Sequence, residues 1–257
     1  MNNLYEEILK EKRKIMKELD LVDDDIIYIS GSLVEGIGNK YSDIDIFIIT
    51  NDIKKIELTN YDYDETKLKT IFREFIGKKC DIEIYDIKTI EKNLSILNKV
   101  EIEKVRIANI FDEIPTNKFL SFLHRMLVGQ VLNNEKSFEN IRRKINKDKY
   151  YKVLSLYYQN EIENIYDDLV GNMENKNYIT TILLGNTIIP SLMAYYLASK
   201  EVSIDRRKWS YIYLKRLAEK DKNVLNLLTE FEKFLFLKIE KEKYAKELLK
   251  FINKIIQ

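Results

Sequence analysis

The chain has 257 residues, of which 45% are hydrophobic and 33% charged, a composition typical of a folded globular protein rather than a disordered one. Its 43 basic and 42 acidic side chains leave a net charge of +1, which argues against a protein that works mainly by gripping polyanionic nucleic acid. One cysteine excludes an intramolecular disulfide, and one histidine excludes a Cys/His zinc cluster. No stretch approaches 18 consecutive apolar residues, so we expect a cytoplasmic protein that does not interact with a membrane.

The first half of the chain mixes helical and strand patterns. Apolar residues at helical spacing predict a helix over residues 3–20, and alternating β-rich runs predict strands over 26–29, 43–50 and 80–85. A helix that Gly77 closes is predicted over 65–78 and another over 88–97, with a further strand over 106–111.

The second half is helical throughout. Pro115 ends the secondary-structure element that precedes it, and Thr116 or Asn117 can cap the helix that follows. Helical periodicity then covers residues 118–133, 135–146, 148–170, 176–199, 208–219 and 222–256. Pro190 is expected to kink or divide the fourth of these helices. We therefore predict two domains: an α+β domain with a short mixed sheet flanked by helices (1–114) and an all-α helical bundle (115–257).

A glycine cluster follows the first predicted strand. Gly31, Gly36 and Gly38 are three of only seven glycines in the chain, which indicates backbone that takes unusual dihedrals or approaches a ligand closely. The N–H groups and hydroxyl of Gly31-Ser32 can donate hydrogen bonds to a phosphate. The cluster is not a P-loop, because Ile37-Gly38 stands where Lys and Ser/Thr are needed. Nor is it a dinucleotide fingerprint, because a tyrosine replaces the last small residue.

Two acidic pairs lie on the predicted strands. Asp43 and Asp45 share one face of a strand, with side chains about 7 Å apart, and Asp81 and Glu83 share a face of another. Converging carboxylates raise one another's pKa, and a bound cation removes that cost. Oxygen ligands suit Mg²⁺, and two such ions would stabilise both oxygens of an in-line phosphoryl displacement. An Asp-Ile-Asp triplet alone is more often a solvated strand face. Its combination with the Gly-Ser turn and a second acidic strand favours the metal site.

The segment from Ile29-Ser30-Gly31-Ser32 through Gly36-Ile37-Gly38-Asn39-Lys40-Tyr41 to Ser42-Asp43-Ile44-Asp45 resembles the DNA polymerase β-like nucleotidyltransferase superfamily. Within that superfamily it looks most like the small-molecule adenylyltransferases that inactivate aminoglycosides. The matching strand order extends the resemblance over residues 1–113. The resemblance implies catalytic Mg²⁺ ligands and nucleotide-binding residues at these positions: Asp43 and Asp45 for the metal, and Gly31, Ser32 and Ser42 for the nucleotide.

The third acid of the implied site comes from the strand over 80–85. The relatives place a glutamate before a hydrophobic residue there, as metal ligand and general base toward the acceptor hydroxyl, which favours Glu83. Asp81 shares the same face, and the sequence leaves the choice open. In the helical half, Lys208-Trp209 resembles a Lys-then-Trp helix start whose lysine reaches the nucleotide phosphates across the interdomain cleft. A basic helix start beside a buried Trp209 explains these residues equally well. His124 lies among apolar residues and is expected to be structural.

The resemblance implies an Mg²⁺-dependent enzyme that transfers AMP from ATP, or from another nucleoside triphosphate, to a hydroxyl of a small-molecule acceptor and releases pyrophosphate. An acid-rich site on a near-neutral chain suits a small, aminoglycoside-like cation better than a nucleic acid. One alternative is transfer to a protein or an RNA end, as in toxin–antitoxin systems. Another is a non-catalytic nucleotide-binding module, which predicts the loss of acids that are in fact present. Relatives that complete the cleft with a second subunit leave a homodimer open.

Overall fold

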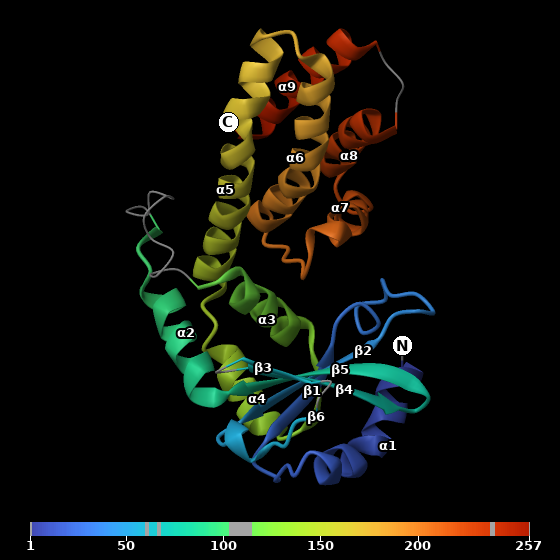
Figure 1. The fold of residues 1–257 in the computed structure, drawn as a ribbon, viewed down its shortest axis with the longest axis vertical. Helices are drawn as coiled ribbons and strands as arrows, with labels where there is room; N and C mark the ends of the chain where they lie inside the picture. Colours follow the sequence, from blue (N-terminus) through green and yellow to red (C-terminus); the bar gives the residue numbers. More distant parts are fainter. Residues whose placement is uncertain (1, 60–61, 66–67, 103–114, 237–239, 257) are drawn as a thin grey trace. The chain divides into compact units, whose positions relative to one another are not determined.

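The computed structural model describes residues 2–59, 62–65, 68–102, 115–236 and 240–256 (Figure 1). The chain divides into two compact units. The first comprises Met1–Val100 and Phe122–Asn146, and the second Glu101–Ser121 and Lys147–Gln257. This division differs from the predicted boundary between residues 114 and 115, because 122–146 pack with the sheet rather than with the helical region.

The first unit is built on a mixed six-stranded sheet in the order β3-β4-β5-β2-β1-β6. The strands are β1 (Ile26–Ser30), β2 (Ile44–Thr50), β3 (Tyr63–Glu65), β4 (Leu68–Phe75), β5 (Lys78–Asp86) and β6 (Gln130–Asn133). The central pair, β2 and β5, is parallel, and the other neighbours are antiparallel. The predicted α+β class is confirmed, with strands over 26–29, 43–50 and 80–85 close to their expected places.

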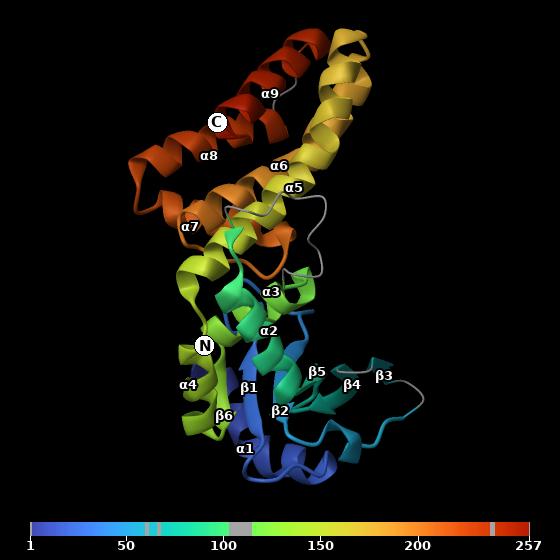
Figure 2. The ribbon, with the colours of Figure 1, turned by 90° about the vertical axis from the view of Figure 1, so that its left-hand side faces the viewer.

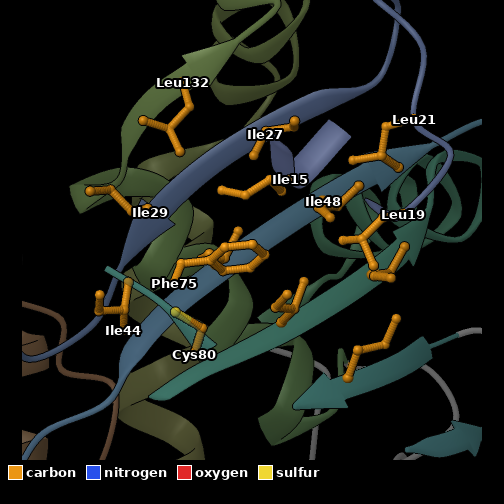
Figure 3. Packing of buried hydrophobic residues seen from close by; sticks show 14 of the residues in the cluster. Ile15, Leu19, Leu21, Ile27, Ile29, Ile44, Ile48, Phe75, Cys80 and Leu132 are labelled. Carbon is orange, nitrogen blue, oxygen red and sulfur yellow. The ribbon is translucent and has the colours of Figure 1, made fainter. Parts of the chain in front are cut away.

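Side-chain alternation divides the sheet into two faces. On one face, Ile27 and Ile48 pack with Ile15 of α1 (Asn2–Glu18) in a fully apolar core (Figure 3). On the other face, Tyr28 stacks on Phe47 at a centroid distance of 5.1 Å. This second face is contacted by α3 (Asn117–Val128) and by α4 (Glu135–Arg143), which lies along β1 and β6 (Figure 2). It is the face that carries the acidic residues of both central strands.

The predicted helix over 65–78 is wrong, since β3 and β4 occupy these positions where they are described. Leu68, Ile71 and Phe75 are spaced three and four residues apart, which fits a helix, but all three are buried by pairing with β5. The Ile76-Gly77 turn decides the structure. Both residues have positive φ, of 50° and 68°, which is the backbone of a two-residue hairpin between Phe75 and Lys78. The expected strand over 106–111 lies outside the described residues.

The predicted helix over 118–133 is too long. It ends at Val128, and 130–133 form β6 at the edge of the sheet beside β1. Leu132 thereby enters the apolar core. The helix predicted over 88–97 is confirmed as α2 (Ile87–Lys99), whose N-terminus is capped by Asp86.

The second unit is helical, as predicted. Its helices are α5 (Lys147–Glu174), α6 (Tyr178–Ser199), the short 3₁₀ turn η3 (Arg207–Trp209), α7 (Ser210–Ala218), α8 (Lys222–Phe236) and α9 (Lys241–Ile256). The single helix expected over 222–256 is therefore two, and Pro190 lies inside α6 without dividing it. Within the described ranges, α6 alone is long and apolar enough to cross a membrane, with 56% of its most apolar window buried in the unit. It packs against α5 and α9.

Candidate active site

The acidic residues of the two central strands meet at one end of the sheet. In the parallel pairing of β2 with β5, Asp45 is the register partner of Asp81. Asp43 directly precedes β2, and all three side chains are half-buried. Because adjacent strands lie about 4.8 Å apart, the carboxylates of Asp45 and Asp81 stand side by side on the same face. The structure thus brings together the two acidic segments that the sequence singled out.

The glycine-rich turn packs directly against Asp45, one member of this acidic pair. Gly31 follows β1 with a φ of +82°, and a Cβ placed on it would lie 1.9 Å from the Oδ2 atom of Asp45. The turn is closed by its own backbone, since the carbonyl of Ser32 accepts hydrogen bonds from the N–H groups of Ile37 (2.9 Å) and Gly38 (2.8 Å). Only glycine combines this backbone angle with so close an approach to a carboxylate. The turn and the acids are therefore one structural unit.

Glu83 is bound by two neighbouring side chains. Its Oε1 accepts a hydrogen bond from Nη1 of Arg125 at 2.7 Å, and its Oε2 accepts one from the hydroxyl of Tyr85 at 2.5 Å. Arg125 is buried, with its guanidinium 5.1 Å above the ring of Phe47, the register partner of Glu83. Both carboxylate oxygens of Glu83 are therefore held by protein groups. Burial, and then the charge of Glu83, raise the pKa of the Tyr85 hydroxyl, which stays a hydrogen-bond donor.

Two neighbouring side chains, Cys80 and Ser30, describe the surroundings of the acids. Burial, together with the charges of Asp81 and Asp43, raises the pKa of the Cys80 thiol to about 11. The register agrees, since Cys80 is the partner of Ile44, the residue after Asp43. Ser30 is the register partner of Asp45 in β1 and is 1% exposed. Its hydroxyl has no hydrogen-bond partner among the residues that the structure describes. A buried hydroxyl without a partner is costly unless a ligand or a water satisfies it.

These residues fit a magnesium ion shared with a phosphate. In the described part of the chain, no three His, Cys, Asp or Glu side chains are already grouped as a metal cluster. Mg²⁺, however, is usually held by one or two carboxylates together with substrate phosphates and water. The neighbouring pair of Asp45 and Asp81, with Asp43 beside them, supplies oxygen donors of this kind.

Two other predicted site residues have local contacts. The hydroxyl of Ser42 accepts a hydrogen bond from the N–H of Asn39 (2.9 Å), which shapes the turn that leads into Asp43. Lys208 belongs to the second unit, where it is exposed and its Nζ lies 4.8 Å from the ring centre of Trp209. The nucleotide contacts expected of both residues stay predictions.

Sequence reasoning missed the part that α3 plays. Its consecutive residues His124 and Arg125 are both buried and contact the acidic side chains of Glu35 and Glu83. These contacts join residues 89 and 42 positions apart, so no local pattern reveals them. The only signal was the presence of a histidine and an arginine on an otherwise apolar helical face.

Comparison with known proteins places the chain in a family. The family model for the nucleotidyltransferase domain matches residues 9–188, more than half of the chain. No curated protein matches this chain. Among solved structures, the chain is similar to a nucleotidyltransferase-like protein from Exiguobacterium sibiricum, with a TM-score of 0.53 and 10% sequence identity. That alignment covers 97% of this chain and 74% of the other, and at this identity it shows a shared fold alone.

Proposed function

The chain belongs to the nucleotidyltransferase domain family, and on that premise we propose that it transfers AMP from ATP to a hydroxyl group of a small-molecule acceptor, releasing pyrophosphate. The observation that carries the proposal is the contact of Gly31 with the carboxylate of Asp45, which is in register with Asp81. This arrangement joins a turn suited to phosphates with oxygen ligands suited to Mg²⁺.

Each part of the site has a role in this reaction. The N–H groups and hydroxyl of Gly31-Ser32 bind the phosphates of the nucleotide. Asp43, Asp45 and Asp81 hold Mg²⁺, which, when bound, neutralises phosphate charge and polarises the reacting phosphoryl group. Most of the rate enhancement then comes from positioning and electrostatic stabilisation, as is general for phosphoryl transfer.

We assign the third acid to Asp81 rather than to Glu83. The register of β2 with β5 supports this choice, because Asp81 is the partner of Asp45 whereas Glu83 is the partner of Phe47. Asp81 then also receives the proton of the acceptor hydroxyl, the role that the resemblance gives to the third acid. Glu83 keeps Arg125 and Tyr85 in place behind it.

The acceptor is proposed to be small and cationic. The site gathers at least three carboxylates on a chain whose net charge is only +1, so the local field is negative while the molecule as a whole is nearly neutral. Such a field attracts an amine-bearing molecule and repels a polyanion. An aminoglycoside-like amino sugar has both the amines and the hydroxyl that the reaction needs.

The metal-site assignment is tested with Asp45→Asn. The purified protein is incubated with Mg·ATP and a pooled panel of amino sugars and metabolites, and mass spectrometry searches for an added AMP. We expect Asp45→Asn to lower kcat by about 10²–10³-fold, because it would remove a ligand of the Mg²⁺ that stabilises the charge of the transition state. Asp24→Asn is the matched control, since Asp24 is exposed before β1. A folded Asp45→Asn variant with the activity of the control would refute the assignment.

The choice of third acid is tested with Asp81→Asn and Glu83→Gln. We expect Asp81→Asn to abolish the stabilisation that Mg·ATP gives in a thermal-shift assay, and Glu83→Gln to retain it at a lower melting temperature. The opposite result would return the role to Glu83. No stabilisation of the unmodified protein by any Mg·nucleotide would favour a module without nucleotidyl-transfer activity.

A further inference from the structure

We propose that His124 is a positioning residue for the Gly31–Gly38 turn and that it acts through Glu35. The inference rests on the proposed function, because that function makes the turn the nucleotide-phosphate site. His124 contacts the side chain of Glu35 within this turn, and through that contact it acts on the turn.

The contact itself is buried. The Nε2 atom of His124 lies 3.1 Å from the Oε2 atom of Glu35, and the two side chains are 1% and 6% exposed. Burying a carboxylate is costly unless it is paired, so this acid and this imidazole are held together. The contact joins the turn to α3 across 89 positions of the chain.

Glu35 also closes the turn. Its N–H donates a hydrogen bond to the carbonyl of Gly31 at 3.1 Å. The residue whose carboxylate is held by His124 is therefore the one whose amide fixes Gly31, the glycine that packs on Asp45. A shift of the Glu35 side chain is passed to the backbone that presents N–H groups to a phosphate. Sites of this kind need their groups held within about 0.5 Å of the productive geometry.

The same helix turn fixes the other side of the site. Arg125, the next residue of α3, holds Glu83 on β5. A rigid helix thus positions both the phosphate-binding turn and the strand that carries Asp81. This arrangement explains why the one imidazole of the chain is fully buried, rather than exposed where it would take part in acid–base chemistry.

The test compares three variants with a control. His124→Leu removes the contact, His124→Gln keeps an N–H donor near the position of Nε2, and the double variant Glu35→Leu/His124→Leu removes both partners. The control is Lys55→Met, which leaves the buried carboxylate of Asp25, paired with Lys55 at 3.0 Å, without that cation. Asp25 lies before the start of β1, at the opposite end of the strand from the turn. The control therefore destabilises the same unit without touching the site.

Two measurements are made on each variant: hydrogen exchange of the amides of residues 31–38 in the absence of nucleotide, and the KM and kcat for Mg·ATP. We expect His124→Leu to speed exchange in the turn and to raise the KM about tenfold with little change in kcat, because the phosphate contact is lost equally from ground and transition states. His124→Gln should restore both. The double variant removes the buried carboxylate together with its imidazole partner, so it should regain melting temperature while its KM stays raised.

The outcomes separate this inference from the proposed function. Unchanged exchange in the turn of His124→Leu, or equal acceleration in Lys55→Met, overturns the positioning role whatever the nucleotide does. The positioning role is also overturned if the double variant regains both its melting temperature and a normal KM, because the rise in KM of His124→Leu would then be an effect of stability alone. Faster exchange in a protein that binds no Mg·nucleotide would uphold the mechanical role and refute the nucleotide site.

Discussion

Replacement of Gly31 by alanine tests the central geometry of the site. The new Cβ would lie 1.9 Å from Oδ2 of Asp45 and 2.7 Å from its Cγ, whereas real Cβ atoms essentially never come within 3.0 Å of a heavy atom of a residue that is not a chain neighbour. The carboxylate must therefore retreat by about 1.1 Å, and because Cγ also clashes, rotation of the terminal oxygens alone does not relieve the contact. Alanine at a φ of +82° adds about 1–2 kcal/mol of backbone strain.

Gly77→Ala supplies the matched control for this substitution. Gly77 has a φ of +68°, and nothing lies within 4 Å of the Cβ it would gain. It therefore bears the backbone strain without the clash. Urea unfolding should show both variants destabilised by about 1–2 kcal/mol, with an additional loss in Gly31→Ala from the displaced Asp45.

Activity should separate the two variants far more than stability does. A displacement of about 1 Å in a catalytic group costs on the order of 10²-fold in rate, so we expect kcat/KM for Mg·ATP to fall by that factor in Gly31→Ala and to be unchanged in Gly77→Ala. The measurement is the rate of pyrophosphate release under conditions where both proteins are folded. Equal rates in the two variants would show that the position of the Asp45 carboxylate does not matter to the reaction.

Two further predictions follow from shifted pKa values. Cys80 is 1% exposed with a thiol pKa of about 11, so at pH 8 only about one thiol in a thousand is ionised; a thiol reagent should label the protein only after unfolding, and rapid labelling of the folded form would contradict the buried site. Burial raises the pKa of Asp62, but hydrogen bonds from Thr59, Arg73 and Phe72 outweigh it and hold the pKa below its ordinary value of 3.8. A depressed pKa gives stability that is present above the unfolded value and lost as the pH falls through the folded value. Asp62→Asn should therefore be less stable than the unmodified protein at pH 7, and the difference should shrink below about pH 3.8; urea unfolding across this range would refute the reasoning if the gap stayed constant.

Local signals carried the prediction of the turn and the first two acids. Strand alternation, the rarity of glycine and the spacing of 14 positions from Gly31 to Asp45 are all read from one short segment, and the antiparallel pairing of β1 with β2 brings those residues together. The prediction for residues 68–75 was wrong because the local pattern there does not decide the structure. Their apolar spacing suits a helix and a strand alike, and pairing with β5 decides between them.

The roles of the second acidic pair depend on contacts that no local pattern contains. Residues 81 and 83 are both acidic and lie on the same face of one strand, so the sequence alone does not distinguish their roles. What separates them is Arg125, which reaches Glu83 from 42 residues away and lies over the ring of Phe47. A buried arginine of this kind is found only once α3 has been placed on the sheet.

The register of β2 with β5 joins these observations into one argument. The same pairing that puts Asp81 beside Asp45 puts Glu83 beside Phe47, two positions further along. A shift of one residue would bring an apolar residue next to Asp45 and turn both acids toward the core, which a strand buried on that face does not tolerate. Register therefore gives two similar carboxylates different neighbours: Asp81 lies beside Asp45, and Glu83 lies beside Phe47 and is bound by Arg125. Our proposal of Asp81 as the third acid therefore rests on strand pairing rather than on the type of side chain.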